Sequence, residues 1–158
     1  MFYTFRRAML DDLPLLRQWQ RTPDVAEWWD ADDPFDAADL ADGRTAAWIV
    51  SAGNTPFAYL QDYDVHGWDP HHFGYLPPGS RGIDQYIGIA DMIGRGHGTA
   101  FLRQRLGALF AAEAPVVATD PHPDNARAIA AYHKAGFCIT GPQQETEWGL
   151  ILPMEARP

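Results

Sequence analysis

The hydrophobic pattern predicts hairpin-like strands in the first half of the chain and alternating strands and helices in the second half. Short apolar or alternating runs bounded by turn residues predict strands at 2–7, 46–51, 57–65, 81–90, 115–120, 137–140 and 147–152. Apolar residues at helical spacing predict helices at 13–19, at 22–29, within 30–43, through 102–110 and up to 135. This order predicts a mixed sheet flanked by helices, in the α/β (α+β) class.

Residues near the ends of two predicted helices mark where these helices begin and stop. Asp11 and Asp12 stand as N-cap and first-turn acids ahead of the first helix. Asp124 or Asn125 is expected to cap the last helix, and Gly136 is expected to end it. In the longest helix, the spacing predicts a buried face, formed by Leu102, Leu106, Leu109 and Phe110.

One long segment without a regular pattern lies between the predicted hairpin and the next strand. Residues 66–80 contain three prolines and three glycines among aromatic residues, which predicts an ordered loop over a site, acting as a lid. The loop also carries His66, His71, His72 and nearby Asp69. No two of these have the helical i, i+4 spacing of a metal-ligand pair and the loop is rich in proline, so we expect no metal site.

Length and composition indicate a folded protein. With 158 residues, of which 46% are hydrophobic, we expect one domain over residues 1–158. No apolar run approaches the ~18 residues needed to span a bilayer, and the first residues do not resemble a signal peptide, so we expect a cytoplasmic location. Cys138 is the single cysteine, which excludes an intrachain disulfide and a multi-cysteine zinc site.

The negative charge is concentrated in one part of the chain. The formal net charge is −9, and residues 22–80 contain eleven acids and one base, Arg44. Such a stretch repels nucleic acid and anionic membranes and attracts cations, so the expected partner is a cationic small molecule or peptide. A solvated acidic surface that only maintains solubility is the alternative.

Three glycines at alternate positions precede the longest predicted helix. In the segment IGRGHGTAF, Gly94, Gly96 and Gly98 leave successive backbone N–H groups free to face a phosphate at the positive end of the helix dipole. The segment lacks the Gly-Lys-Ser/Thr of a Walker loop and the G-x-G-x-x-G spacing of a dinucleotide fingerprint. A turn followed by a helix cap explains the glycines equally well.

A second block, TDPHPDNARAIAAYHKAGF, begins 20 residues after Thr99. Together the two blocks resemble the acetyl-CoA signature of the GCN5-related N-acetyltransferase (GNAT) superfamily. In that superfamily the glycine loop holds the pyrophosphate of acetyl-CoA, and the later tyrosine lies near the thioester. The resemblance implies a mostly antiparallel central sheet, with acetyl-CoA as co-substrate.

Several shorter motifs resemble the aminoglycoside 6'-N-acetyltransferases more narrowly. These are RGIDQ at 81–85, the GxGxGT loop at 94–99, TDPxPxNxRAI at 119–129, the run Glu27, Trp28, Trp29 and the spacing of Tyr59, Gln61 and Tyr63. The chain departs from the superfamily at Ile93, where the loop commonly begins with Arg or Gln. The 66–80 loop matches no part of the pattern, which leaves the identity of the amine acceptor open.

Acyl transfer from a thioester to an amine requires removal of the amine proton and protonation of the departing thiolate. An alkyl ammonium has a pKa near ~10, so a carboxylate must accept its proton, and Asp84 is the candidate general base. The alternatives are an exposed strand residue or one that only holds the ammonium. Tyr132 has a reference pKa near ~10 against ~8.5 for a thiol, which makes it the candidate general acid, with helix packing as the alternative.

The resemblance implies further contacts with both substrates. Those with acetyl-CoA are a backbone N–H near Ile87 for the thioester oxygen and contacts from Gly94, Arg95, Gly96, Gly98, Thr99 and Asn125. Expected substrate-binding residues besides Asp84 are Trp29, Gln61, Tyr63 and Asp120. For Asp120, at a strand end before Pro121, a turn-forming role is the alternative, and for Trp28 and Trp29 it is core packing. His97 is expected to face solvent.

The leading hypothesis is direct acetyl transfer from acetyl-CoA to the 6'-amine of an aminoglycoside in a ternary complex, without a covalent enzyme intermediate. A second keeps the enzyme class but changes the acceptor to a polyamine, a lysine side chain or a hydroxamate precursor. A third is a non-catalytic acyl-CoA-binding module, because one fold hosts many functions.

Overall fold

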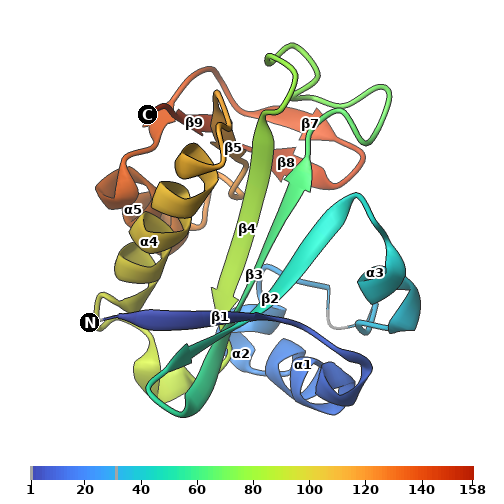
Figure 1. The fold of residues 1–158 in the computed structure, drawn as a ribbon, viewed down its shortest axis with the longest axis vertical. Helices are drawn as coiled ribbons and strands as arrows, with labels where there is room; N and C mark the ends of the chain where they lie inside the picture. The colour runs from blue at the N-terminus through green and yellow to red at the C-terminus, as the bar shows by residue number, and fades with distance from the viewer. Residues whose placement is uncertain (1, 31) are drawn as a thin grey trace. The chain divides into compact units, whose positions relative to one another are not determined.

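The computed structural model describes residues 2–30 and 32–158 (Figure 1). The strands are β1 (Tyr3–Arg7), β2 (Thr45–Ala52), β3 (Thr55–Asp64), β4 (Arg81–Ile87), β5 (Val117–Thr119), β6 (Cys138–Ile139), β7 (Gln144–Thr146), β8 (Gly149–Ile151) and β9 (Met154–Ala156). The α-helices are α1 (Leu13–Gln20), α2 (Pro23–Ala26), α3 (Ala37–Ala41), α4 (His97–Ala111) and α5 (Ala126–Ala135). Two 3-10 turns, η1 (Leu10–Asp12) and η2 (Ala90–Met92), complete the elements.

Hydrogen bonds join seven strands in the order β1-β2-β3-β4-β5-β9-β6. Strands β4 and β5 are parallel, whereas β1 pairs antiparallel with β2, and β9 pairs antiparallel with both β5 and β6. The expected mixed, mostly antiparallel sheet with helices is confirmed. Strands β7 and β8 form a separate two-stranded sheet.

The contacts within the chain group it into two compact units. The first comprises residues up to Asp62 together with Gln85–Gly98, and the second comprises Tyr63–Asp84 and Thr99–Pro158. Strands β3 and β4 therefore contribute residues to both units. Each candidate residue belongs to one of these two units.

The first unit is built around an aromatic core. Its buried residues come from α1, α2 and strands β2 to β4, and are Leu16, Trp19, Val25, Ala47, Ile49, Tyr59 and Tyr86. Trp19 packs directly on Gly88, where no larger side chain fits. Predicted helices at 13–19 and within 30–43 are confirmed, but α2 is shorter than 22–29, so Trp28 and Trp29 follow it in a turn.

Asp12 does not cap α1 with its side chain, contrary to the prediction. Its carboxylate instead forms a two-pronged ion pair with Arg6 of β1, at 2.7 and 2.8 Å, and accepts a hydrogen bond from the Met9 N–H at 2.7 Å. The Arg6 guanidinium lowers the pKa of Asp12 below its usual range. A charged partner on the neighbouring strand thus takes the carboxylate in place of the helix N–H groups.

The second unit buries a smaller cluster formed by the end of β3, the segment after it and β5. Its members are Tyr63, Val65, Phe73, Leu76, Val116 and Ala118. Helix α4 buries Phe101, Leu102, Leu106 and Leu109 but leaves Phe110 only partly covered, so the predicted apolar face is displaced toward Phe101. Helix α5 lies beside α4 (Figure 1), and the Arg103 guanidinium donates to the Lys134 carbonyl.

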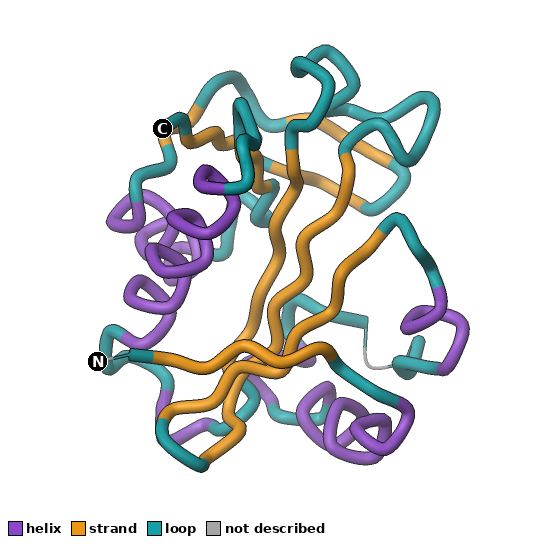
Figure 2. The backbone as a smooth tube through the Cα atoms, in the orientation of Figure 1, coloured by secondary structure: helices purple, strands orange, loops and turns teal. Residues whose placement is uncertain are grey.

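Residues 66–80 form an ordered segment without helix or strand, as expected (Figure 2). The Val65 N–H donates to the Ser80 carbonyl at 3.3 Å and closes its base. The His66 imidazole hydrogen bonds the Leu76 carbonyl at 2.9 Å, and the Tyr75 hydroxyl donates to Glu155 of β9. These bonds, together with buried Phe73 and Leu76, hold the loop without a regular hydrogen-bond ladder.

At the C-terminus the prediction is confirmed only in part. The expected strand at 147–152 contains β8 but begins with the β7–β8 turn, and the last strand of the large sheet is β9, which was not predicted. The register pairs Thr146 with Gly149, so Glu147 and Trp148 form the tip of a two-residue hairpin. Gly149 adopts a left-handed φ of 109°, a conformation that suits glycine after such a turn.

Substitution of Gly82 tests the packing of β4 against Tyr63. A Cβ at Gly82 would lie well inside contact distance of the Tyr63 ring, so Gly82→Ala is expected to lower the free energy of unfolding by about 2 to 3 kcal/mol. The matched control is Gly107→Ala at an exposed position of α4, where a Cβ meets no atom within 4 Å. This substitution should raise the free energy of unfolding by about 0.5 to 1 kcal/mol. Urea denaturation measures both, and equal effects would contradict the assigned packing.

Candidate active site

The parallel pairing of β4 and β5 brings two carboxyl groups together in the second unit. The register aligns Arg81 with Val117 and Gly82 with Ala118, and the Thr119 hydroxyl donates to the Ile83 carbonyl at 2.9 Å. Two further residues along, Asp84 lies opposite Asp120, and their side chains are hydrogen bonded to each other. The two strongest candidates for proton and ammonium chemistry are therefore one pair.

Two carboxyls in contact do not both ionise readily, so the pair favours a single negative charge until a cation is bound. The Asp120 side chain is only 15% exposed, and burial raises its pKa from 3.8 to about 6. A second negative charge in the pair becomes favourable once a cation arrives nearby. The pair can hold an ammonium and accept its proton.

Two tyrosines lie within electrostatic range of this pair. Tyr63 is buried, and burial together with the charges of Asp120 and Asp84 raises its pKa well above 10, so its hydroxyl stays protonated. The ring of Tyr132 is buried on α5 against Phe137, at 5.3 Å between ring centroids, and its hydroxyl interacts electrostatically with Tyr63. Asp84, Asp120, Tyr63 and Tyr132 therefore form one group.

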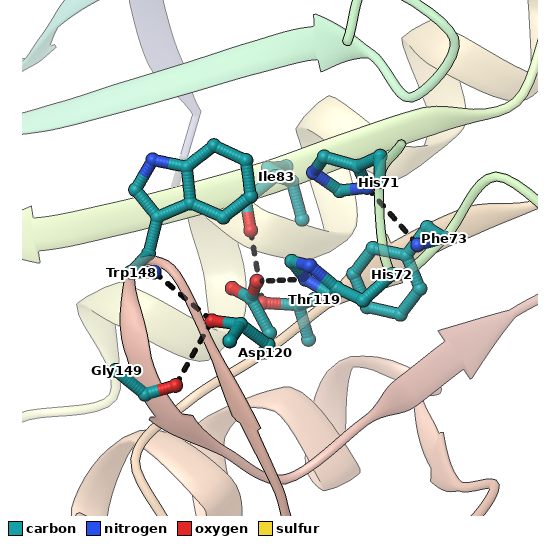
Figure 3. Close-up of polar contacts among 9 residues, drawn as sticks. His71, His72, Phe73, Ile83, Thr119, Asp120, Trp148 and Gly149 are labelled. Atoms are coloured by element: carbon teal, nitrogen blue, oxygen red, sulfur yellow. Dashed lines mark hydrogen bonds and ion pairs between the residues drawn. The ribbon is translucent and has the colours of Figure 1, made fainter. Parts of the chain in front are cut away.

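Aromatic side chains around Asp120 were not expected from the sequence (Figure 3). Nε2 of His72 lies 2.7 Å from Oδ2 of Asp120, and His71 stacks on His72 with 4.1 Å between ring centroids. Trp148, from the β7–β8 tip, is 52% exposed and lies 5.1 Å from His71 and 5.7 Å from His72. The composition of the loop singled out the histidines, but only as possible metal ligands. Nothing in the sequence singled out Trp148.

Candidate substrate-binding residues in the first unit meet at Tyr59. The Tyr59 hydroxyl donates to Oε1 of Gln61 at 2.8 Å. Trp29 packs edge-on against Tyr59 and Tyr86, at 6.0 and 5.1 Å, and belongs partly to the aromatic core. The Tyr86 hydroxyl is buried and has no hydrogen-bond partner among residues 2–30 and 32–158. Trp29 and Gln61 therefore both contact Tyr59, and Trp29 also packs against the aromatic core.

The glycine loop has the local geometry of an anion site. Gly94 and Gly96 adopt φ values of 77° and 84°, and a Cβ at either would meet no atom within 4 Å. The backbone there is open to the close approach of a pyrophosphate, and α4 begins immediately afterwards at His97. Arg95 is exposed, as a side chain free to meet a phosphate must be.

His97 does not face solvent, contrary to the prediction. Its Nδ1 forms a hydrogen bond of 2.8 Å with the Tyr3 hydroxyl, and its ring packs against Phe57 at 5.3 Å. This contact anchors the first residue of α4 to β1. At the other candidate helix start, Asn125 caps α5 by accepting from the Ala128 N–H at 3.3 Å, and Gly136 ends it with a φ of 116°, as predicted.

Metal sites and membrane-spanning helices are two further features of interest. Within the part of the chain that the structure describes, no three His, Cys, Asp or Glu side chains are grouped to hold a metal ion. No helix in those same residues has the length and apolar character needed to cross a membrane.

Comparison with known proteins identifies the family. The model of the acetyltransferase (GNAT) domain matches residues 8–144. This chain belongs to the GNAT acetyltransferases. The matched range includes the carboxyl pair, the glycine loop and Tyr132.

The GNAT acetyltransferase has annotated and solved relatives. It is 32% identical to an aminoglycoside N(6')-acetyltransferase type 1 of Klebsiella pneumoniae, over 98% of this chain and 83% of the relative. It is 48% identical to a kanamycin resistance protein of Rhizobium radiobacter, over 51% of this chain and 75% of that protein. The structure of AAC(6')-Ib with coenzyme A and kanamycin superposes with a TM-score of 0.88 at 31% identity, covering 99% and 95% of the two chains.

Asp120→Asn tests the burial of the carboxyl pair. Because the folded-state pKa of Asp120 lies near 6, above its usual 3.8, the group stabilises the fold below pH ~4 and this contribution is lost as the pH rises through 6. Asparagine should therefore raise the free energy of unfolding by about 1 to 3 kcal/mol at pH 7.5, and much less at pH 4. Urea denaturation at both pH values measures the gain, with exposed Asp124→Asn as control. A gain that does not depend on pH would contradict the assignment.

Proposed function

We propose that this GNAT acetyltransferase transfers an acetyl group directly from acetyl-CoA to the 6'-amine of an aminoglycoside. The observation that carries the proposal is the hydrogen-bonded pair of Asp84 and Asp120, which provides a carboxylate for an ammonium group and a base for its proton. The names of the relatives at 31 to 32% identity, among them a protein solved with kanamycin, support the same acceptor class.

In this proposal Asp84 is the general base. The acceptor amine reaches the site as an ammonium, and Asp84 accepts one of its protons so that the nitrogen lone pair is free to attack. Asp120, in contact with Asp84, holds the positive charge of the acceptor nearby and favours the ionised pair. The cost of burying two carboxyls is thereby offset when the cation is bound.

The residues proposed to bind the co-substrate come from the glycine loop and from α5. Acetyl-CoA, when bound, supplies an activated acetyl thioester. Backbone N–H groups at Gly94–Gly98, with Arg95 and Thr99, would hold its pyrophosphate, and Asn125 its pantetheine arm. A backbone N–H near Ile87 would donate to the thioester oxygen, and the Tyr132 hydroxyl would protonate the departing sulfur.

Aromatic faces are the other requirement for an aminosugar. Trp148 is half-exposed and lies with Trp68 and the two histidines, at 6.3 Å between the tryptophan rings, in the same unit as the carboxyl pair. Flat rings beside carboxylates bind the apolar faces and ammonium groups of a sugar at once. Trp29, Gln61 and Tyr63 stay candidate acceptor contacts, with Trp29 combining this role with core packing.

A polyamine is the second candidate acceptor, favoured by the acidic stretch at 22–80. A spermidine N-acetyltransferase chimera superposes with a TM-score of 0.77 over 98% of this chain and 95% of its own, at 14% identity. That likeness shows the fold alone, because one scaffold serves many acceptors.

Comparison of acceptors tests the proposal. Thiol release from acetyl-CoA is expected with kanamycin or tobramycin and not with a related aminoglycoside carrying a 6'-hydroxyl, because the carboxyl pair deprotonates an ammonium. Spermidine and a lysine peptide serve as comparison acceptors. Faster turnover of spermidine than of kanamycin would show that the acceptor is a polyamine and not an aminoglycoside.

Two substitutions separate catalysis from binding in the same assay. Asp84→Asn should lower kcat/KM for kanamycin by about 10²- to 10⁴-fold while leaving acetyl-CoA binding unchanged, since it removes the base. Exposed Asp11→Asn, which also removes one negative charge, should leave kcat/KM unchanged. Acetyl-CoA binding without turnover of any amine by the unmodified protein would indicate the non-catalytic acyl-CoA-binding module.

Salt tests the part played by the concentrated negative charge. The KM for kanamycin should rise by about three- to tenfold between 20 and 300 mM sodium chloride, because screening shortens the reach of the acidic stretch. The KM for acetyl-CoA should change much less. Equal salt dependence for both substrates would contradict electrostatic attraction of the acceptor.

A further inference from the structure

The loop at 66–80 reaches the carboxyl pair through one histidine. Nε2 of His72 lies 2.7 Å from Oδ2 of Asp120, and the two side chains are 6% and 15% exposed (Figure 3). This bond joins the loop to the end of β5 across 48 residues of sequence. A short, nearly buried contact of this kind constrains both partners.

The surroundings determine which group donates. Burial lowers the pKa of His72, so its ring is neutral near pH 7. Burial raises the pKa of Asp120 to about 6, so its carboxyl is mostly ionised near pH 7. Above pH 6, therefore, a neutral imidazole donates its Nε2–H to the Asp120 carboxylate.

The His72 ring is fixed by its neighbours. His71 stacks on it at 4.1 Å and 22°, and Phe73 lies 4.5 Å away. His71 is itself oriented, because its Nδ1 accepts from the Phe73 N–H at 3.0 Å. Burial and the neighbouring His72 lower the pKa of His71 to about 4, so His71 adds no positive charge to the stack near neutrality.

The titratable groups that face His72 come from four segments. Asp120 follows β5, Asp84 lies on β4, Glu147 lies at the β7–β8 tip, and His71 precedes His72 in the loop. The charges of Asp84 and Glu147 raise the pKa of His72, but burial, the largest effect, lowers it. The balance retains the hydrogen bond without a buried imidazolium.

We propose that His72 is a positioning residue of the acceptor site, whose Nε2–H holds the Asp120 carboxylate in place and in its charged form. A buried carboxyl is otherwise protonated readily, and a protonated Asp120 attracts no ammonium. With Oδ2 held by His72, Asp120 retains its charge near neutral pH for the incoming cation. The role in the acceptor site rests on the proposed function, whereas the effect of His72 on Asp120 is independent of any substrate.

Titration of Asp120 tests the bond directly. Aspartate carboxyl carbons labelled with ¹³C are followed by NMR from pH 4 to 9 without substrate, and the signal lost in Asp120→Asn identifies Asp120. His72→Phe should raise the Asp120 midpoint by about one pH unit, because a donor to the ionised form is removed. His72→Gln, whose amide N–H replaces Nε2–H, should restore the midpoint, and exposed His133→Gln on α5 should not move it. An unchanged midpoint in a folded His72→Phe protein would overturn the proposal.

The pH profile of kcat/KM for kanamycin, at saturating acetyl-CoA, tests the consequence. The acidic limb should move upward with His72→Phe, giving about a threefold loss at pH 6.5 and almost no loss at pH 8.5, and return with His72→Gln. A uniform loss at every pH would indicate a merely structural role, and a lower KM for kanamycin would show that His72 competes with the acceptor, so either overturns the proposal. A shifted NMR midpoint without turnover of any aminoglycoside would sustain the effect on Asp120 while rejecting the proposed function.

Discussion

The hydrogen bond between Asp84 and Asp120 is the interaction around which the candidate site is arranged. Two carboxyls in a nearly buried position oppose folding unless they share a proton or meet a cation. The parallel register of β4 and β5 forces them together, and the neighbouring groups moderate the cost: His72 donates to one, and the Tyr63 hydroxyl stays protonated beside both. The pair opposes folding while no cation is bound, and this is why it is the candidate site in the proposed function.

Two separate devices serve the acceptor in the proposed function, and they act over different distances. The acidic residues between 22 and 80 create a long-range field, limited by the Debye length of ~8 Å at physiological salt. The carboxyl pair and the rings of His71, His72 and Trp148 act at contact distance, where charge and flat apolar surface are presented together. The first accounts for attraction of any polycation, and only the second discriminates among them.

The division between scaffold and specificity follows the division between regular elements and loops. In the proposed function the GNAT sheet and the glycine loop contribute backbone groups to acetyl-CoA. The segment at 66–80 and the β7–β8 tip present side chains, and they are the parts whose role could not be inferred from the family resemblance. A rigid sheet that carries variable loops lets one reaction be directed to different amines without altering the strands that position the base.

The sequence by itself predicted the family and the fold class, together with most of the helices and strands. The spacing of the glycine loop and the later tyrosine block, the cap at Asn125 and the stop at Gly136 are local signals, because each depends on backbone conformation within a few residues. Only the tertiary structure decided that Asp84 and Asp120 are one pair, that His72 contacts Asp120, that Asp12 pairs with Arg6, and that His97 is held by Tyr3. These partners lie up to 94 residues apart, and their meeting is set by strand register and loop packing, which no local spacing encodes.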